Sequence, residues 1–373
     1  VHMRFWMQPH ILLFSFIPIG AHEVLHALRL WRPVVAASLT IISVCALLNT
    51  NYAAMDQSRN YFVSDFGRSL LERRKPWSIL LTQGDMVTNS VRYLQRCERI
   101  RLDVAHLDMP MMTYEWFKTM HGPHFPTKIT FPGVQFSVGG RKLDSHLKCC
   151  PYSMKAFLDA NMQNKSRPVY LVGGWYGSET PAHLDPKGGI PGYGLEHVGM
   201  AARIVSANKG LSWKEFKDEI SLFNVSEAAI PGVSYDTRTW EYSIRVNYIT
   251  YIQAQAVQTM DKAVLRGKES EESPWVKEQK FIKQAIAGLE WSLRLAEETP
   301  GFDGHEDIYR NLGIAYGRLK CPEHERYPQV DCPGQTKMRD MFRKFLAVTS
   351  KSPQQTANEK LVIDNPDKFI NLG

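Results

Sequence analysis

The residues best able to do chemistry lie between Thr82 and Asn89, with Asp108 further along the chain. Thr82 follows the apolar run Ile79 to Leu81, which predicts a buried strand that leads into a helix. Asp108 ends a second predicted strand, residues 103–108. In an open parallel sheet, ligands bind beyond the carboxyl ends of the strands, so we expect these side chains to share one rim. A carboxylate at such a rim is suited to accept a proton from a hydroxyl group or to hold a polar ligand.

The side chains expected at this rim, or just beyond it, suit contact with a sugar or a peptide. Ordinary structural roles compete with this interpretation, because Asp, Thr or Asn at the start of a helix commonly caps it, and aromatic residues commonly pack in a core. His106 is expected to be a hydrogen-bonded histidine, buried or half-buried in its strand. The predicted substrate-binding residues are Gln83, Gly84, Asp85, Thr88, Asn89, Asp108, Tyr114, Glu115 and Trp116.

The stretch His22-Glu23-Val24-Leu25-His26 satisfies the H-E-x-x-H pattern of zinc proteases. On a helix this pattern supplies two zinc ligands and a general base, but a catalytic site needs a third ligand from a neighbouring segment. We therefore interpret the stretch as a polar turn, expect no metal, and keep a membrane zinc metalloprotease as a third functional hypothesis.

Two stretches without Lys, Arg, Asp or Glu, residues 5–22 and 33–55, are each close to the length of about 20 residues that spans a bilayer. Together they predict two transmembrane helices within residues 1–56, with a single signal-anchor helix or buried core helices as the alternatives. Arg29 and Arg32 lie between them and favour a cytosolic turn, which would leave the rest of the chain in the lumen.

Other features agree with a lumenal body. Asn164 and Asn224 begin glycosylation acceptor triplets. Cys321 and Cys332 flank a proline-containing loop and are candidates for a disulfide in an oxidising compartment. The net charge of +7 comes without a dense basic cluster, so we expect no nucleic acid as a partner. The predicted transmembrane helices imply membrane lipid as a partner.

The remaining periodicity predicts an α/β fold class with a helical second part. Residues 57–205 mix strands and helices and predict a Rossmann-like domain, with further strands at 128–131 and 168–172 and a surface loop at 188–194. Residues 350–373 read as a polar tail. Residues 206–349 predict tetratricopeptide-like helical hairpins, although no clean repeat of about 34 residues is present. The predicted helices span residues 60–71, 213–223, 239–265, 275–298, 305–319 and 337–348.

A series of short motifs occurs in a fixed order along the first third of the chain. They are Arg4-Phe5-Trp6-Met7-Gln8, Asn60-Tyr61, Gly67-Arg68-Ser69-Leu70-Leu71, Ile79-Leu80-Leu81, Gln83-Gly84-Asp85, Thr88-Asn89-Ser90, Arg92-Tyr93, Cys97-Glu98 and Met112-Thr113-Tyr114-Glu115-Trp116. Together they resemble the lumenal part of the transmembrane protein 260 family, protein O-mannosyltransferases of the endoplasmic reticulum. The match is dense over residues 3–120 and thin beyond.

The resemblance implies the carboxyl-terminal part of a membrane enzyme that transfers mannose from dolichyl-phosphate mannose to Ser or Thr of secretory-pathway proteins. The family's catalytic carboxylate is expected in an earlier lumenal loop and has no matching position here, so the catalytic residues are unknown. We expect this chain to hold no cofactor, to be inactive alone, and to recognise the acceptor or stabilise the catalytic part. A non-catalytic lumenal interaction module is the alternative.

Overall fold

The computed structural model describes residues 61–126, 128–137, 151–162, 167–174, 190–221, 235–269, 275–319 and 333–348, with scattered positions between 20 and 50. The chain divides into two compact units, Val1–Asn60 and Tyr61–Gly373. The predicted domain boundary at residue 205 lies within the second unit, where one apolar core continues from the sheet into the helical part.

In the first unit, residues 40–46 are helical and exposed, including Ile41, Ile42 and Val44. Among the residues described, no helix combines the length and the apolar character needed to cross a bilayer. The stretches predicted to do so, 5–22 and 33–55, lie largely outside the described residues, so the two transmembrane helices stay a prediction.

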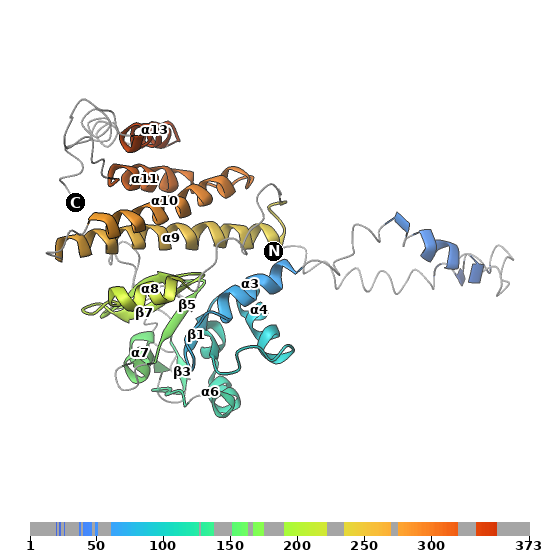
Figure 1. Ribbon diagram of the computed structural model, residues 1–373. Helices are drawn as coiled ribbons and strands as arrows, with labels where there is room; N and C mark the ends of the chain where they lie inside the picture. Colours follow the sequence, from blue (N-terminus) through green and yellow to red (C-terminus); the bar gives the residue numbers. More distant parts are fainter. Residues whose placement is uncertain are drawn as a thin grey trace. The chain divides into compact units, whose positions relative to one another are not determined.

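The second unit, in its described part, is built around a mixed five-stranded sheet (Figure 1). The strand order in this sheet is β2-β1-β5-β7-β6. β1 pairs in parallel with β2 and β5, whereas β7 is antiparallel to β5 and β6. Two further short strands, β3 and β4, pair in parallel with each other. The strands are β1 (Ile79–Thr82), β2 (Ala105–Asp108), β3 (Gln135–Phe136), β4 (Pro151–Tyr152), β5 (Val169–Val172), β6 (Tyr193–Val198) and β7 (Ala201–Ser206).

Both faces of the parallel strands are covered, which explains why β1 and β5 are almost continuously apolar. Every residue of these two strands is buried. Because successive side chains point to opposite faces, Leu80 and Val172 enter one core while Leu81 and Leu171 enter the other. By the same alternation, Thr82 at the end of β1 faces the side of Leu80.

Different helices cover the two faces. The core that contains Leu80 receives apolar side chains from α3, α4, α8 and α9. The core that contains Leu81 receives them from α5, α6 and α7. The helices are α3 (Phe62–Leu71), α4 (Asp85–Arg96), α5 (Met109–Met112), α6 (Glu115–His121), α7 (Met154–Met162), α8 (Trp213–Ser221) and α9 (Trp240–Glu269).

Three further helices stack on α9 in chain order (Figure 1). α10 (Trp275–Glu297) packs on α9, α11 (His305–Gly317) on α10, and α13 (Pro333–Val348) on α11. The helices predicted from periodicity in this region are therefore confirmed, with their ends displaced by a few residues. The tetratricopeptide-like assignment stays a prediction.

The structure corrects the predicted sheet in two places. Residues 128–131 form no strand, because the Asn161 side chain bonds both the N–H and the carbonyl of Thr130, at 3.0 and 2.8 Å. The predicted loop at 188–194 is also wrong in part, since β6 begins at Tyr193. β6 and β7 are antiparallel and were not expected, so the Rossmann-like assignment is not confirmed.

Candidate functional site

The parallel strands end in line, which brings the predicted rim together. Thr82, the last residue of β1, lies opposite Asp108 of β2 and Val172 of β5. The Gln83 N–H donates to the Val172 carbonyl at 3.0 Å, which holds the turn after β1 against the end of β5. The structure therefore places Gln83, Gly84 and Asp85 at the same edge as Asp108.

The turn from β1 into α4 leaves polar groups at the surface. Gly84 has φ +94°, a value that favours glycine, and α4 starts directly after it. The N-cap residue is Gly84, which has no side chain to cap the helix, and the capping alternative for Asp85 stays a prediction. Asp85 and Asn89 are exposed, and Gln83 is half-buried with its Oε1 atom enclosed and without a hydrogen-bond partner in the described part of the chain.

Thr88 points inward and belongs to a buried polar network. Its hydroxyl lies 3.0 Å from the hydroxyl of Thr82, which in turn lies 2.8 Å from Nε2 of His106. Burial, reinforced by Arg92 and Arg96, lowers the pKa of His106 to about 3. The expectation of a hydrogen-bonded histidine in this strand is confirmed, and its ring is neutral at neutral pH.

Because His106 is held neutral in the fold, we expect the folded chain to lose stability in mild acid. A lowered folded-state pKa means that the unfolded chain takes up the proton first, so the free energy of unfolding falls as the pH drops below the ordinary histidine pKa of about 6.5. His197, whose pKa burial lowers to about 4, acts in the same direction. We expect each to contribute at most about 1.4 kcal/mol per pH unit between about pH 6.5 and 5, where most carboxylates stay ionised.

Urea unfolding at several pH values in this window checks the expectation. The His106→Gln variant should lose less stability on acidification than the parent chain does. His305→Gln, which replaces a histidine at the start of α11, serves as the control and should keep the parent's pH dependence. Equal slopes for all three proteins would show that His106 is not held neutral by the fold.

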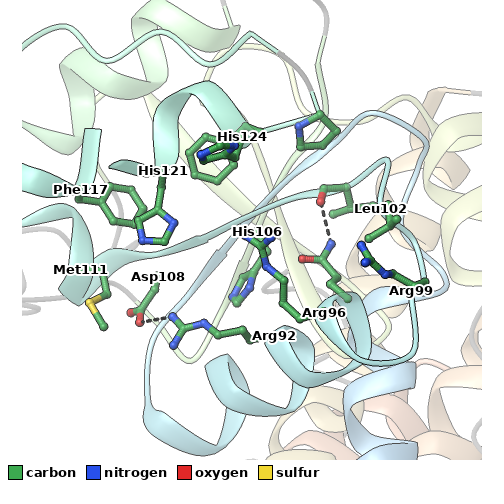
Figure 2. Close-up of a pocket in the computed structure, with 14 residues that line it drawn as sticks. Arg92, Arg96, Arg99, Leu102, His106, Asp108, Met111, Phe117, His121 and His124 are labelled. Carbon is green, nitrogen blue, oxygen red and sulfur yellow. Dashed lines mark hydrogen bonds and ion pairs between the residues drawn. The ribbon is translucent and has the colours of Figure 1, made fainter. Parts of the chain in front are cut away.

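A cavity of about 260 Å3 opens beside β2, the edge strand of the sheet (Figure 2). α4 forms one side, and α6 with the short 3-10 turn η1 (Gly122–His124) forms the other. Gln95 of α4 donates to the Val104 carbonyl at 2.8 Å and so fixes the helix against the start of β2. The charged and imidazole side chains in the lining are Arg92, Arg96, Arg99, His106, Asp108, His121 and His124.

Asp108 connects this cavity to the rim. Its Oδ2 atom lies 3.2 Å from Nη2 of Arg92 (Figure 2). Burial raises the pKa of Asp108 above the ordinary value, because it outweighs the opposite effect of Arg92. The predicted site residue Asp108 therefore has a structural partner that the sequence alone had not indicated.

Tyr114, Glu115 and Trp116 lie at the surface beyond the cavity. Tyr114 is 53% exposed and Trp116 45% exposed, and their rings stack with centroids 5.6 Å apart. Trp116 also lies 5.9 Å from the His121 ring, which lines the cavity. The alternative that these aromatic residues pack in the core is wrong, because both rings of the stacked pair are exposed.

The sequence interpretation missed the basic and imidazole residues of the cavity. Arg92, Arg96 and Arg99 recur at helical spacing, a signal that a search for contiguous basic runs overlooks. His121 and His124 carried no local signal. They reach the arginines only because α6 and η1 fold back beside β2.

Several predicted positions lie outside the described residues: Asn164, Asn224, Cys321 and Cys332. Within the described residues no group of three His, Cys, Asp or Glu side chains is arranged to hold a metal ion. His22 and His26 are described in the first unit, where their rings stack 6.2 Å apart, and the protease hypothesis stays untested because most of that unit lies outside the described residues.

Comparison with known proteins bears on the family resemblance. The chain is 27% identical over 383 aligned positions to the protein O-mannosyl-transferase tmem260 of Dictyostelium discoideum, covering 96% of this chain and 43% of that protein. It is 30% identical over 170 positions to the protein O-mannosyl-transferase TMEM260 of Mus musculus, covering 44% of this chain and 24% of that protein. No protein-family model and no solved structure matches the chain.

These similarities confirm the resemblance drawn from the short motifs. The alignment with the Dictyostelium protein covers nearly the whole chain, whereas the one with the mouse protein covers 44% of it. The matched region spans less than half the length of either relative.

Proposed function

We propose that this chain is an accessory region of a membrane protein O-mannosyltransferase, where it recognises the acceptor polypeptide or stabilises the catalytic membrane part. The donor is dolichyl-phosphate mannose, the acceptors are Ser or Thr residues of secretory-pathway proteins, and the region lies in the lumen of the endoplasmic reticulum. The observation that carries the proposal is the similarity to the Dictyostelium protein, because it extends over 96% of this chain.

The surface beyond the parallel strands supports a role in acceptor recognition. Asp85 and Asn89 present polar groups at the rim, and the stacked Tyr114 and Trp116 rings form an exposed aromatic face on the segment after β2. Aromatic side chains provide large contact areas at low entropic cost, and polar neighbours can bond the backbone of an extended segment. An acceptor polypeptide needs both kinds of contact.

Mannose transfer to an acceptor domain, measured with this chain and with the longest polypeptide encoded at its locus, tests the proposal. We expect the longer polypeptide to transfer mannose and this chain alone to be inactive. Replacing both Tyr114 and Trp116 by alanine in the longer polypeptide should raise KM for the acceptor about tenfold while kcat changes little, because the contacts serve binding rather than the chemical step.

Trp77→Ala is the matched control. Trp77 is 57% exposed but precedes β1, so it lies at the opposite end of the strands from the rim. Transfer by this chain alone would contradict the accessory role. An unchanged KM in the double variant would remove the aromatic pair from acceptor recognition. Absence of transfer by every polypeptide from the locus would favour the non-catalytic interaction module.

A further inference from the structure

The cavity beside β2 carries more positive charge than its surroundings neutralise. Of its three arginines, Arg92 is paired with Asp108, the carboxylate of the described lining. The side chains of Arg96 and Arg99 make no hydrogen bond or ion pair with any residue in the described ranges, although both line the cavity. Two guanidinium groups thus face the same small space without a counter-charge from the described protein.

The backbone at Arg99 has an unfavourable conformation that no visible interaction of its side chain with the described residues offsets. Arg99 has φ +59° and Arg101 has φ +49°, a region that costs a residue with a side chain about 1–2 kcal/mol. For Arg101 the compensation is visible, because its guanidinium bonds both carboxylate oxygens of Asp103 at 2.8 Å and the Glu72 carbonyl at 2.5 Å. The Arg99 side chain has no such bonds among the described residues, and it lines the cavity.

The His121 ring, which lines the cavity, is affected by the same positive charge. Burial lowers the pKa of His121, and Arg96, Arg92 and His124 lower it further. Two arginines of α4 and a histidine of η1 therefore act on one ring of α6. An anion placed among them would reverse this repulsion, since opposite charges favour the protonated form of histidine.

The rest of the lining is apolar and limits what fits. Leu102, Met111, Phe117 and Phe125 line the cavity beside the basic residues. Small-molecule sites typically measure about 300–1,000 Å3, so a cavity of about 260 Å3 suits one small ligand or head group. The ligand should combine a compact anion with a less polar portion.

We propose that this cavity binds the phosphate group of a small organic phosphate, with Arg96, Arg99 and His121 holding the phosphate oxygens and the apolar wall holding the attached organic group. Guanidinium groups bind phosphate in a bidentate, charge-assisted manner, and a phosphate dianion balances two cations where a carboxylate balances one. This inference depends only on the cavity and is independent of the proposed role in mannose transfer.

Isothermal titration calorimetry with the full 373-residue chain tests it, using three probes at constant ionic strength. Inorganic phosphate, a hexose 1-phosphate and a water-soluble short-chain isoprenyl phosphate distinguish a free ion, a sugar phosphate and a lipid head group as the source. We expect saturable binding of at least one organic phosphate, tighter than inorganic phosphate. The Arg96→Ala/Arg99→Ala variant should raise Kd at least tenfold, and the Arg96→Lys/Arg99→Lys variant should raise it less.

The control variant Arg294→Ala/Arg310→Ala removes the same charge from α10 and α11 and should bind like the parent chain. In the histidine NMR spectrum, the bound phosphate should move the titration of His121 to higher pH in the parent chain but not in the Arg96→Ala/Arg99→Ala variant. The proposal is overturned if no organic phosphate binds saturably, if both double-alanine variants weaken binding equally, or if an acidic peptide alone binds through Arg96 and Arg99.

Discussion

Replacing Gly173 by alanine should destabilise the second unit by about 3–5 kcal/mol. Gly173 directly follows β5 with φ +84°, and a Cβ atom there would lie 2.2 Å from the Gln83 carbonyl oxygen. That contact is with backbone, so no side-chain rotation can relieve it. The Gly173 N–H also donates to the Tyr251 hydroxyl at 2.9 Å, and a displaced backbone would lose this bond to α9.

Gly174→Ala provides the matched control. Gly174 has a similar φ of +81°, but the space where its Cβ atom would lie is open. This variant should cost only the left-handed backbone penalty of about 1–2 kcal/mol. The free energy of unfolding in urea measures both variants. Equal losses at the two positions would mean that the turn after β1 does not lie against Gly173, and the strand-end rim would need a different geometry.

Replacing Glu219 by alanine should cost about 3 kcal/mol or more, because it leaves buried positive charge without its partner. The Glu219 side chain on α8 is 4% exposed. It accepts a hydrogen bond from the Tyr170 hydroxyl at 3.0 Å, lies 3.0 Å from the Lys75 ammonium, and pairs with the Arg203 guanidinium. Arg74 is buried over the Tyr170 ring, 5.0 Å from its centroid, and Glu219 is among the groups that favour its charged form against the effect of burial.

Glu215→Ala, on the same helix, is the control. It shows how much stability is lost when a glutamate of α8 outside the buried cluster is removed. Glu215 is exposed and forms a capping box with Ser212, so its removal should cost about 1 kcal/mol. Glu219→Gln keeps a hydrogen-bond acceptor for Tyr170 but removes the charge, and it should fall between the two alanine variants. If urea unfolding gives the same loss for Glu215→Ala and Glu219→Ala, the charged cluster is effectively solvated.

The sequence alone determined the elements whose pattern is complete within one segment. The apolar runs at 79–81 and 168–172 became β1 and β5, and the helical periodicity after residue 239 became α9, α10, α11 and α13. The His106 hydrogen bond and the shared strand-end rim followed from the same local patterns. Such features are predictable because burial on one or two faces imposes a period of about 2 or 3.6 residues on the element itself.

Only the tertiary structure decided which segments meet. The antiparallel β6 and β7 join the sheet beside β5, a choice set by pairing between distant strands rather than by their own composition. The cavity likewise needs α4, β2 and η1 side by side, so that Arg96, Arg99 and His124 line the same space. The periodicity of one segment cannot predict which segments come together, because that depends on how separate hydrophobic faces pack. The sequence therefore indicated the rim at the strand ends, whereas the fold created the basic cavity beside it.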